Sequence, residues 1–259
     1  MKVCALQLEL AYKDVSKNKR RITEMVETAV MRNKPDVFVL PEMWNVSFFP
    51  DNLEETSDKD GEEMTAFLSG LAKKHQVNIV GGSVAVKSEN KYYNTSYSFD
   101  REGELVHTYN KVHLFSPSEE DKMFTAGNEL GIFKLDGVKV GVATCYDLRF
   151  TEWIKRMALE GIQVLFVPAA WPHPRVAIWE TLLRARAIEN QFFVVGVNST
   201  GTTDKLNFCG HSAIYDPLGE RLTSGREDEK LLWADLDIGS IVNIRREMPV
   251  YKDRRPELY

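Results

Sequence analysis

Three short segments of the sequence each combine a chemically reactive side chain with apolar neighbours. A glutamate follows the predicted strand that ends at Leu40, within residues 41–44 (PEMW). A lysine in apolar company follows the predicted strand 104–110, within residues 110–115 (NKVHLF), and a cysteine follows the predicted strand 138–144, within residues 144–149 (TCYDLR). In sheets whose strands alternate with helices, side chains at strand ends gather into functional sites. Each of the three alone is better explained as a solvated charge or a buried thiol, but together their chemistry is complementary.

These side chains supply a nucleophile, a base and an electrophile. A thiol attacks well only as the thiolate, and Cys145 lies at a predicted strand–helix turn, where a helix N-terminus favours negative charge. Glu42 can accept the thiol proton and later deprotonate a water molecule. Lys111, together with the backbone N–H of Tyr146, can stabilise the oxyanion that forms when a carbonyl is attacked. The set is complete for acyl transfer through a thioester.

Two alternating periodicities predict the elements that must carry these residues. Apolar residues recur at helical spacing in four segments, residues 16–33, 60–75, 150–160 and 175–190. Apolar runs predict strands at residues 2–8, 36–40, 77–86, 138–144, 163–167, 193–198 and 229–235, and hairpins within 91–110 and 208–222. The predicted fold is α/β with mixed sheets covered by helices, and a two-sheet sandwich accommodates this many strands better than one open sheet.

Length and composition narrow the class of protein. The chain has 259 residues, 43% of them apolar and 27% charged, so it can bury a large core and is not expected to be disordered. No linker and no repeat of 20–50 residues interrupts it, so residues 1–259 are interpreted as a single domain. The formal net charge of −5 makes nucleic acid an unexpected partner.

The sequence predicts a cytoplasmic protein. The first ten residues include a glutamine and a glutamate, which interrupt the apolar region of a signal peptide, and no stretch approaches the roughly 20 apolar residues that span a bilayer. The cysteines are too few for a disulfide framework and are expected to be reduced: Cys4, Cys145 and Cys209. Without export, three glycosylation triplets are chance matches, at Asn45, Asn94 and Asn198.

Taken in order, the three reactive segments resemble the signatures of the nitrilase superfamily of carbon–nitrogen hydrolases. The separations of 69 residues from Glu42 to Lys111 and 34 residues from Lys111 to Cys145 fit this family. The likeness runs along the whole chain and includes residues 179–191 (WETLLRARAIENQ) and Asn198. The resemblance implies a four-layer α-β-β-α sandwich, often paired into an eight-layer dimer.

The resemblance also implies roles for individual residues. Glu42 would be the general base, Lys111 the oxyanion stabiliser and proton donor, and Cys145 the nucleophile. The family has a second glutamate that positions the lysine and the substrate. Its best match is Glu120, with Glu119 as a one-residue alternative, and a solvated acidic loop is the other explanation of this pair.

Within the family, the chain is most similar to the omega-amidase branch. The similarity lies in residues 145–150 (CYDLRF), 168–175 (PAAWPHPR) and 185–191 (ARAIENQ). That branch hydrolyses the terminal amide of 2-oxoglutaramate or 2-oxosuccinamate and releases ammonia. Thr151 departs from the family, where proline is common, but this change affects only the start of a helix.

A substrate derived from a dicarboxylate needs a cation for its distal carboxylate. Arginine is the better planar clamp for a carboxylate, and Arg149 and Arg175 are the candidates. Trp171 would form an apolar wall, and Tyr146 would contact the substrate next to the nucleophile. Arg149 could equally be a structural ion-pair partner.

Several alternatives remain open at this point. N-carbamoyl amines, N-carbamoyl amino acids and nitriles could react with the same Glu-Lys-Cys set. A catalytically silent interaction module would have lost one of these three residues, yet all are present. A papain-like hydrolase would pair Cys145 with His173 or His211, but the expected signature around the cysteine is missing.

No metal or cofactor is expected, and a homodimer or higher homo-oligomer is implied by the resemblance alone. Cys209 and His211 lack a second cluster of ligands at metal-binding spacing, and no phosphate-binding glycine loop is present. Four residues are apolar enough for a subunit interface but could equally belong to the core: Tyr215, Val250, Tyr251 and Tyr259.

Overall fold

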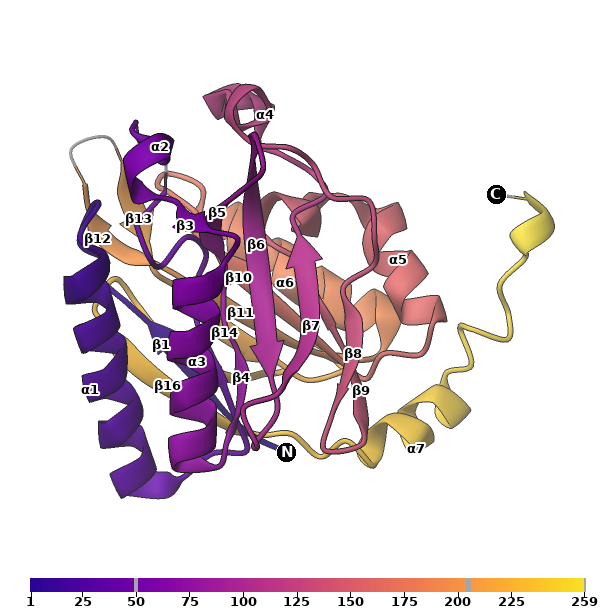
Figure 1. Cartoon of the computed structure of the whole chain (residues 1–259). Helices are drawn as coiled ribbons and strands as arrows, with labels where there is room; N and C mark the ends of the chain where they lie inside the picture. Colours follow the sequence, from indigo (N-terminus) through magenta and orange to yellow (C-terminus); the bar gives the residue numbers. More distant parts are fainter. Residues whose placement is uncertain (49–50, 204–205, 259) are drawn as a thin grey trace.

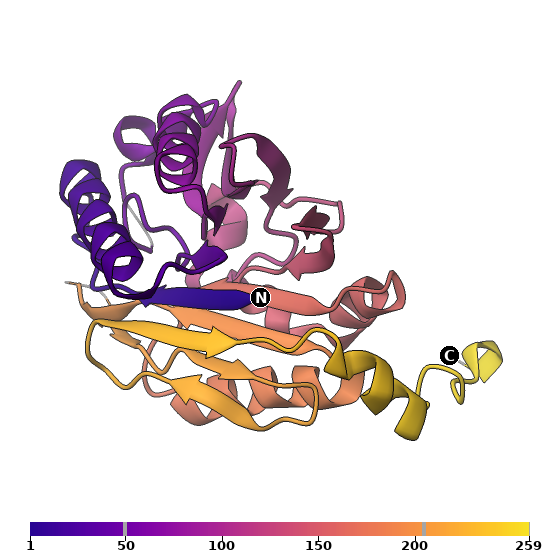
Figure 2. The same cartoon turned by 90° about the horizontal axis from the view of Figure 1, so that it is seen from below.

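Two β-sheets pack face to face, and helices cover their outer faces (Figures 1 and 2). The computed structural model describes residues 1–48, 51–203 and 206–258. Helices α1 and α3 cover the first sheet, and α5 and α6 cover the second (Figure 2). The predicted four-layer α-β-β-α sandwich is therefore confirmed.

The first sheet has the order β16-β1-β2-β4-β6-β5-β3, with β7 paired to β6. Its strands β1, β2 and β4 run parallel, whereas β16, at the end of the chain, pairs antiparallel with β1. The strands are β1 (Lys2–Gln7), β2 (Val37–Val39), β3 (Asp58–Lys59), β4 (Asn78–Val80), β5 (Val84–Ser88), β6 (Lys91–Phe99), β7 (Leu105–Asn110) and β16 (Lys230–Asp235).

The second sheet has the order β15-β14-β11-β10-β9-β8. Strands β9, β10 and β11 are parallel and central, and two antiparallel strands follow β11. Its strands are β8 (Ile132–Leu135), β9 (Val138–Val142), β10 (Val164–Ala169), β11 (Phe193–Asn198), β14 (Ala213–Tyr215) and β15 (Arg221–Ser224). A separate two-stranded sheet consists of β12 (Thr200–Thr202) and β13 (Asn207–Cys209).

The helices connect the strands of each sheet. The first begins after Asp14, whose side chain accepts a hydrogen bond from the Lys17 N–H and so caps the helix. The α-helices are α1 (Val15–Asn33), α2 (Leu53–Thr56), α3 (Glu62–His75), α4 (Glu120–Met123), α5 (Thr151–Leu159), α6 (Val176–Asn190) and α7 (Ser240–Glu247). The 3-10 helices are η1 (Ser116–Ser118), η2 (Cys145–Arg149) and η3 (Pro256–Leu258).

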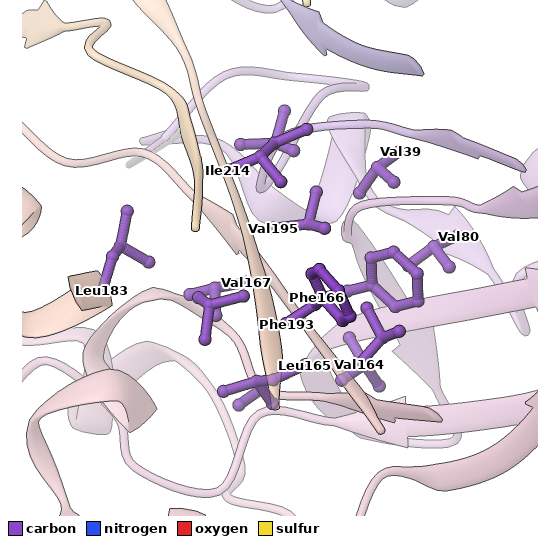
Figure 3. Packing of buried hydrophobic residues seen from close by; sticks show 14 of the residues in the cluster. Val39, Val80, Val164, Leu165, Phe166, Val167, Leu183, Phe193, Val195 and Ile214 are labelled. Atoms are coloured by element: carbon purple, nitrogen blue, oxygen red, sulfur yellow. The ribbon is translucent and has the colours of Figure 1, made fainter. Parts of the chain in front are cut away.

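Strand alternation divides the apolar residues between two cores. In β1, Val3 and Ala5 face the second sheet, whereas Cys4 and Leu6 face α1 and α3. The same alternation in β10 directs Phe166 toward the first sheet and Val167 toward α6 (Figure 3). Because both faces of these strands are covered, they contain nearly continuous apolar runs. Each fully buried aliphatic side chain contributes roughly 1.5–3 kcal/mol to stability.

Two predicted elements differ from the structure. The single strand expected at residues 77–86 is divided into β4 and β5 by the pair Gly81-Gly82. The hairpin expected at residues 208–222 starts only at β14, because β13 pairs with β12 instead. Among the described residues, no helix combines the length and apolar content that crossing a membrane requires.

Candidate active site

The predicted base, lysine and nucleophile meet at one end of the sandwich, and they come from different sheets. Glu42 follows β2 and Lys111 follows β7, both in the first sheet, whereas Cys145 follows β9 in the second. Glu42 and Lys111 have no exposed surface, and Cys145 is 8% exposed. The packing of the two sheets therefore decides whether these side chains meet.

The turn after β2 fixes the Glu42 carboxylate. The Met43 N–H donates to Ser83 Oγ at 3.0 Å, and Trp44 Nε1 donates to the Gly81 carbonyl at 2.7 Å. Gly82 has a φ of +61°, and a side chain there would collide with the carbonyl of the residue before Glu42. The Gly81-Gly82 pair that divides the predicted strand thus lets the chain pass close to the site.

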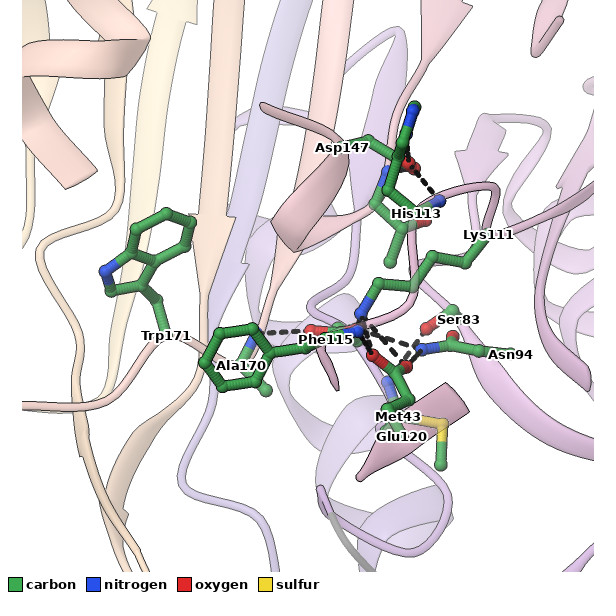
Figure 4. Close-up of polar contacts among 12 residues, drawn as sticks. Met43, Ser83, Asn94, Lys111, His113, Phe115, Glu120, Asp147, Ala170 and Trp171 are labelled. Carbon is green, nitrogen blue, oxygen red and sulfur yellow. Dashed lines mark hydrogen bonds and ion pairs between the residues drawn. The ribbon is translucent and has the colours of Figure 1, made fainter. Parts of the chain in front are cut away.

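Lys111 forms the centre of a buried charged cluster (Figure 4). Its Nζ donates to Glu42 Oε1 at 2.9 Å and to Glu120 Oε1 and Oε2 at 3.0 and 2.7 Å. Glu120 also accepts the Phe115 N–H at 2.6 Å. Of the two glutamates considered from the sequence, Glu120 lies in this cluster, whereas Glu119 is exposed and pairs with a surface lysine.

Asn94 belongs to the same cluster, although sequence reasoning missed it. This residue of β6 is 1% exposed, and its Nδ2 donates to Glu42 Oε1 at 2.9 Å and to Glu120 Oε1 at 3.1 Å. In the sequence, Asn94 stands out only as the first residue of a chance glycosylation triplet. Polar and apolar residues alternate along this strand, which is the pattern of a strand with one exposed face, so the sequence carried no signal that Asn94 is buried.

Glu42 also connects the two sheets. Its Oε2 accepts the N–H of Ala170, the residue that follows β10, at 2.9 Å. The Glu42 carboxylate and the Ala170 backbone also lie close enough to the Cys145 thiol to act on its pKa. Base, thiol and this backbone N–H therefore lie together where the two sheets meet.

Cys145 is the first residue of η2, with a φ of +48°. This left-handed backbone conformation is uncommon for a residue with a side chain. Burial and the Glu42 carboxylate raise the pKa of the thiol well above its ordinary value, and they outweigh the opposing effect of Lys111. The expected help of a helix N-terminus therefore does not make the resting cysteine a thiolate.

The pKa values of the other two groups follow from burial and charge. Burial raises the pKa of the Glu42 carboxyl more than Lys111 lowers it, and the Glu120 carboxylate raises it further. Burial alone lowers the pKa of Lys111, but the carboxylates of Glu120 and Glu42 outweigh this and raise it above its ordinary value. The lysine is therefore an ammonium, and Glu42 is a stronger base than an exposed glutamate.

A cavity of about 130 Å³ opens onto the thiol. All four residues predicted to bind substrate line it together with Cys145: Tyr146, Arg149, Trp171 and Arg175. The Arg149 guanidinium lies 4.8 Å from the centre of the Trp171 ring. Within residues 1–48, 51–203 and 206–258, neither arginine forms an ion pair with a carboxylate, so the structural explanation of Arg149 is not supported.

Asn198 fixes the tryptophan wall of this cavity. Its Oδ1 accepts the Trp171 N–H at 2.6 Å, and its Nδ2 donates to the Trp171 and Gly210 carbonyls at 3.1 and 2.7 Å. Nδ2 also lies 3.3 Å from Cys209 Sγ. Asn198 and Cys209 are completely buried, and burial raises the pKa of this thiol to about 12, so Cys209 packs as an inert side chain.

The two histidines considered for a papain-like pair or a metal site, His173 and His211, have other partners. The imidazole of His173 lies 3.4 Å from a Glu227 oxygen, and that of His211 lies 3.1 Å from a Glu180 oxygen. In the described part of the chain, no group of three or more His, Cys, Asp or Glu side chains could hold a metal ion. Both histidines thus contact carboxylates rather than the Cys145 thiol.

The interface candidates are distributed differently. Tyr215 is 1% exposed and belongs to the core. Tyr251 is half-buried and its hydroxyl donates to the Asn190 carbonyl, whereas Val250 is 37% exposed. Tyr259 lies outside the described residues.

Comparisons with known proteins agree with this geometry. The sequence matches the carbon-nitrogen hydrolase family over residues 2–246. It is 42% identical to the 2-oxoglutaramate amidase of Bacillus subtilis (strain 168), over 99% of this chain and 98% of that protein. It is 33% identical to the omega-amidase NIT2 of Mus musculus, over 94% and 91% of the two chains.

A solved structure agrees as well. The carbon-nitrogen hydrolase from Helicobacter pylori G27 superimposes with a TM-score of 0.93 at 26% identity, covering 100% of this chain and 96% of that one. The resemblance to the nitrilase superfamily, and within it to the omega-amidases, is confirmed. The chain therefore belongs to the carbon-nitrogen hydrolase family, whose members are enzymes that hydrolyse carbon–nitrogen bonds.

Proposed function

We propose that this enzyme hydrolyses the terminal amide of a small omega-amide, such as 2-oxoglutaramate or 2-oxosuccinamate, to the carboxylate and ammonia. The relatives from Bacillus subtilis (strain 168) and Mus musculus are named amidases, and amidase activity is the part of the function that they support. The observation that carries the proposal is the buried group of Glu42, Lys111 and Cys145 at a small cavity lined by two arginines that form no ion pair with a carboxylate of the described residues.

The first half of the reaction forms a thioester. Glu42 accepts the Cys145 thiol proton while the sulfur attacks the amide carbon, so the raised pKa of the carboxyl favours this transfer. The Lys111 ammonium and the Tyr146 N–H stabilise the developing oxyanion. The carbon–nitrogen bond then breaks, the amide nitrogen takes the proton from Glu42, and ammonia leaves. Glu120 and Asn94 keep Lys111 and Glu42 in place.

The second half hydrolyses the thioester. Glu42 deprotonates a water molecule, which attacks the thioester carbon, and Lys111 again stabilises the oxyanion. The carbon–sulfur bond breaks, the product leaves as a carboxylic acid, and Cys145 recovers its proton. The thiol is thus a proton donor at the start and a leaving group at the end, which suits a group that is neutral at rest.

The cavity supports a small anionic substrate. Pockets for drug-sized ligands have volumes of about 300–1,000 Å³, and this cavity of about 130 Å³ suits a shorter chain. Either Arg149 or Arg175 can pair with a distal carboxylate through two parallel hydrogen bonds. Trp171 and Phe115 provide the apolar walls between that carboxylate and the thiol.

The central experiment measures ammonia release from a panel of compounds. The panel contains 2-oxoglutaramate, glutamine, asparagine, an N-carbamoyl amino acid, N-carbamoylputrescine and a nitrile. We expect the wild-type enzyme to prefer 2-oxoglutaramate and Cys145→Ser to lose turnover while it remains folded. Preference for a carbamoyl compound or the nitrile would refute the substrate, and undiminished turnover by Cys145→Ser would refute the thioester.

A second experiment identifies the arginine that binds the carboxylate. Loss of a charge-assisted pair costs about 1.5–3 kcal/mol, so Arg149→Gln or Arg175→Gln should raise KM for 2-oxoglutaramate by roughly 10- to 100-fold. Turnover of butyramide, which has no carboxylate, should change little. Arg246→Gln is the control, since this exposed arginine of α7 is remote from the cavity. Equal losses with both amides would contradict a carboxylate clamp.

We also propose that the chain forms one domain, works in the cytoplasm and associates as a homodimer. All three cysteines are unpaired, as expected in a reducing compartment. Two apolar side chains are exposed at and beside helix α6, on the outer side of the second sheet: Ile188 (47%) and Leu218 (61%). Such exposed apolar groups favour a contact between two copies.

A further inference from the structure

Asp147 lies two residues after the proposed nucleophile and is completely buried. Its carboxylate accepts four hydrogen bonds, two on each oxygen. Oδ1 accepts the His113 N–H at 2.8 Å and contacts His113 Nδ1 at 2.7 Å (Figure 4). Oδ2 accepts the Tyr109 hydroxyl at 2.6 Å and the Thr144 N–H at 2.9 Å. Nothing in the proposed reaction uses this group.

The partners of Asp147 flank the two reacting side chains. Tyr109 and His113 lie two residues before and two residues after Lys111, and Thr144 immediately precedes Cys145. Tyr109 belongs to β7 of the first sheet, whereas Asp147 and Thr144 follow β9 of the second. One carboxylate therefore joins the lysine segment to the nucleophile turn across the space between the sheets.

Aromatic packing holds the His113 side of this connection. The imidazole stacks on the Phe150 ring with centroids 3.7 Å apart and planes inclined by 12°, and the edge of Trp153 approaches it at 5.7 Å. Both rings lie just beyond the nucleophile turn. The segment after Lys111 is thus fixed to the second sheet by a hydrogen-bonded pair and a stacked ring.

We infer that Asp147 is a positioning residue, which holds Cys145 and the Lys111 ammonium at the separation that attack on the amide requires. The inference rests on the proposed thioester reaction. An asparagine has one oxygen instead of two, and its NH₂ group would face two N–H or O–H donors. Replacing the carboxylate should therefore shift the lysine segment against the nucleophile turn without changing either reacting side chain.

The test compares Asp147→Asn with Asp136→Asn. Asp136 is a second carboxylate that joins the two sheets. It lies in the exposed turn before β9, at the opposite end of that strand, and accepts hydrogen bonds from Asn78 and Arg101. Both variants lose a contact between the sheets, but only Asp147 contacts the site. A displacement of about 1 Å can cost about 100-fold in rate, so Asp147→Asn should lower kcat per folded enzyme by that order and change KM little.

Asp136→Asn should keep the wild-type kcat. Wild-type kcat in folded Asp147→Asn, or equal losses in both variants, would overturn the inference. If Asp147→Asn does not fold, Tyr109→Phe is the second test, because it removes a single donor to Oδ2. This variant should lower kcat several-fold at constant KM, and an unchanged kcat would overturn the inference that Asp147 positions the site. Failure of the thioester proposal is recognised separately, because Cys145→Ser would then remain active.

Discussion

The thiol of Cys145 lies next to a buried group that contains two carboxylates and one ammonium. The pKa of the thiol is raised because an additional negative charge there would be adjacent to Glu42 and largely without water. Burial and the Glu42 carboxylate thus oppose ionisation of the thiol, whereas the Lys111 ammonium favours it. The proton moves only when attack transfers the negative charge to the substrate oxygen.

This arrangement predicts opposite effects on acidity and turnover when Glu42 is replaced. In Glu42→Gln the negative charge that raises the pKa of Cys145 is gone while Lys111 remains, so the thiol pKa should fall. Amide turnover should nevertheless be lost, because the base is missing. The thiolate absorbance in the ultraviolet, taken as a difference from Cys145→Ala, measures the titration.

The matched control is Glu119→Gln, which changes a glutamate that is exposed and outside the cluster. It should leave both the thiol titration and the ammonia release unchanged. A thiol pKa that rises in Glu42→Gln would contradict this account of the electrostatics, whatever happens to turnover.

At the scale of elements, the turn from β9 into η2 places Cys145 in the left-handed region. That conformation costs about 1–2 kcal/mol for a residue with a side chain. The chain adopts it because Asp147 fixes the turn on both sides and because the thiol must face Glu42 and the cavity.

Two inactive variants measure this cost. Cys145→Gly should be more stable than Cys145→Ala by about 1 kcal/mol, because glycine adopts a positive φ without strain. At an ordinary buried position the order is reversed. Urea unfolding of both variants gives the difference, and a less stable glycine variant would show that the turn is not strained.

The longer elements were predictable because their apolar residues have a clear period. Helices α1, α3 and α6 begin and end within two residues of the segments predicted from helical spacing. The helix that carries Glu120 has only four residues, too few for a period, so that position depended on family resemblance. The division of residues 77–86 was hidden because glycine pairs also occur within strands.

The place of Asn94 could not be derived from local pattern, because its partners are 52 and 26 residues away in the sequence. Which polar side chain of a buried strand meets a charged group depends on how the strands pair. By contrast, Glu42, Lys111 and Cys145 were predictable because each directly follows a predicted strand and has apolar neighbours. Asp147 lies in residues 144–149, where nothing in the sequence indicates its partners.

At the scale of the whole molecule, the homodimer remains a prediction. The chain has a mass of 29.6 kDa, and we expect sedimentation equilibrium to give twice that value. Leu218→Asp, on the outer side of the second sheet, should shift the equilibrium toward single chains. Leu105→Asp, which changes an exposed leucine of the first sheet, is the control. A single-chain mass for the wild type would refute the dimer.

The division of the site between two sheets coincides with a division along the chain. Residues 1–128 carry Glu42, Asn94, Lys111 and Glu120, whereas Cys145 and the cavity arginines lie beyond an exposed connection at Asn128 and Glu129. If the chain were divided at that connection, the first fragment would lack the nucleophile and the second would lack the base and the lysine. Because β16 of the second fragment pairs with β1 of the first, ammonia release from the mixture would report complementation of the two pieces.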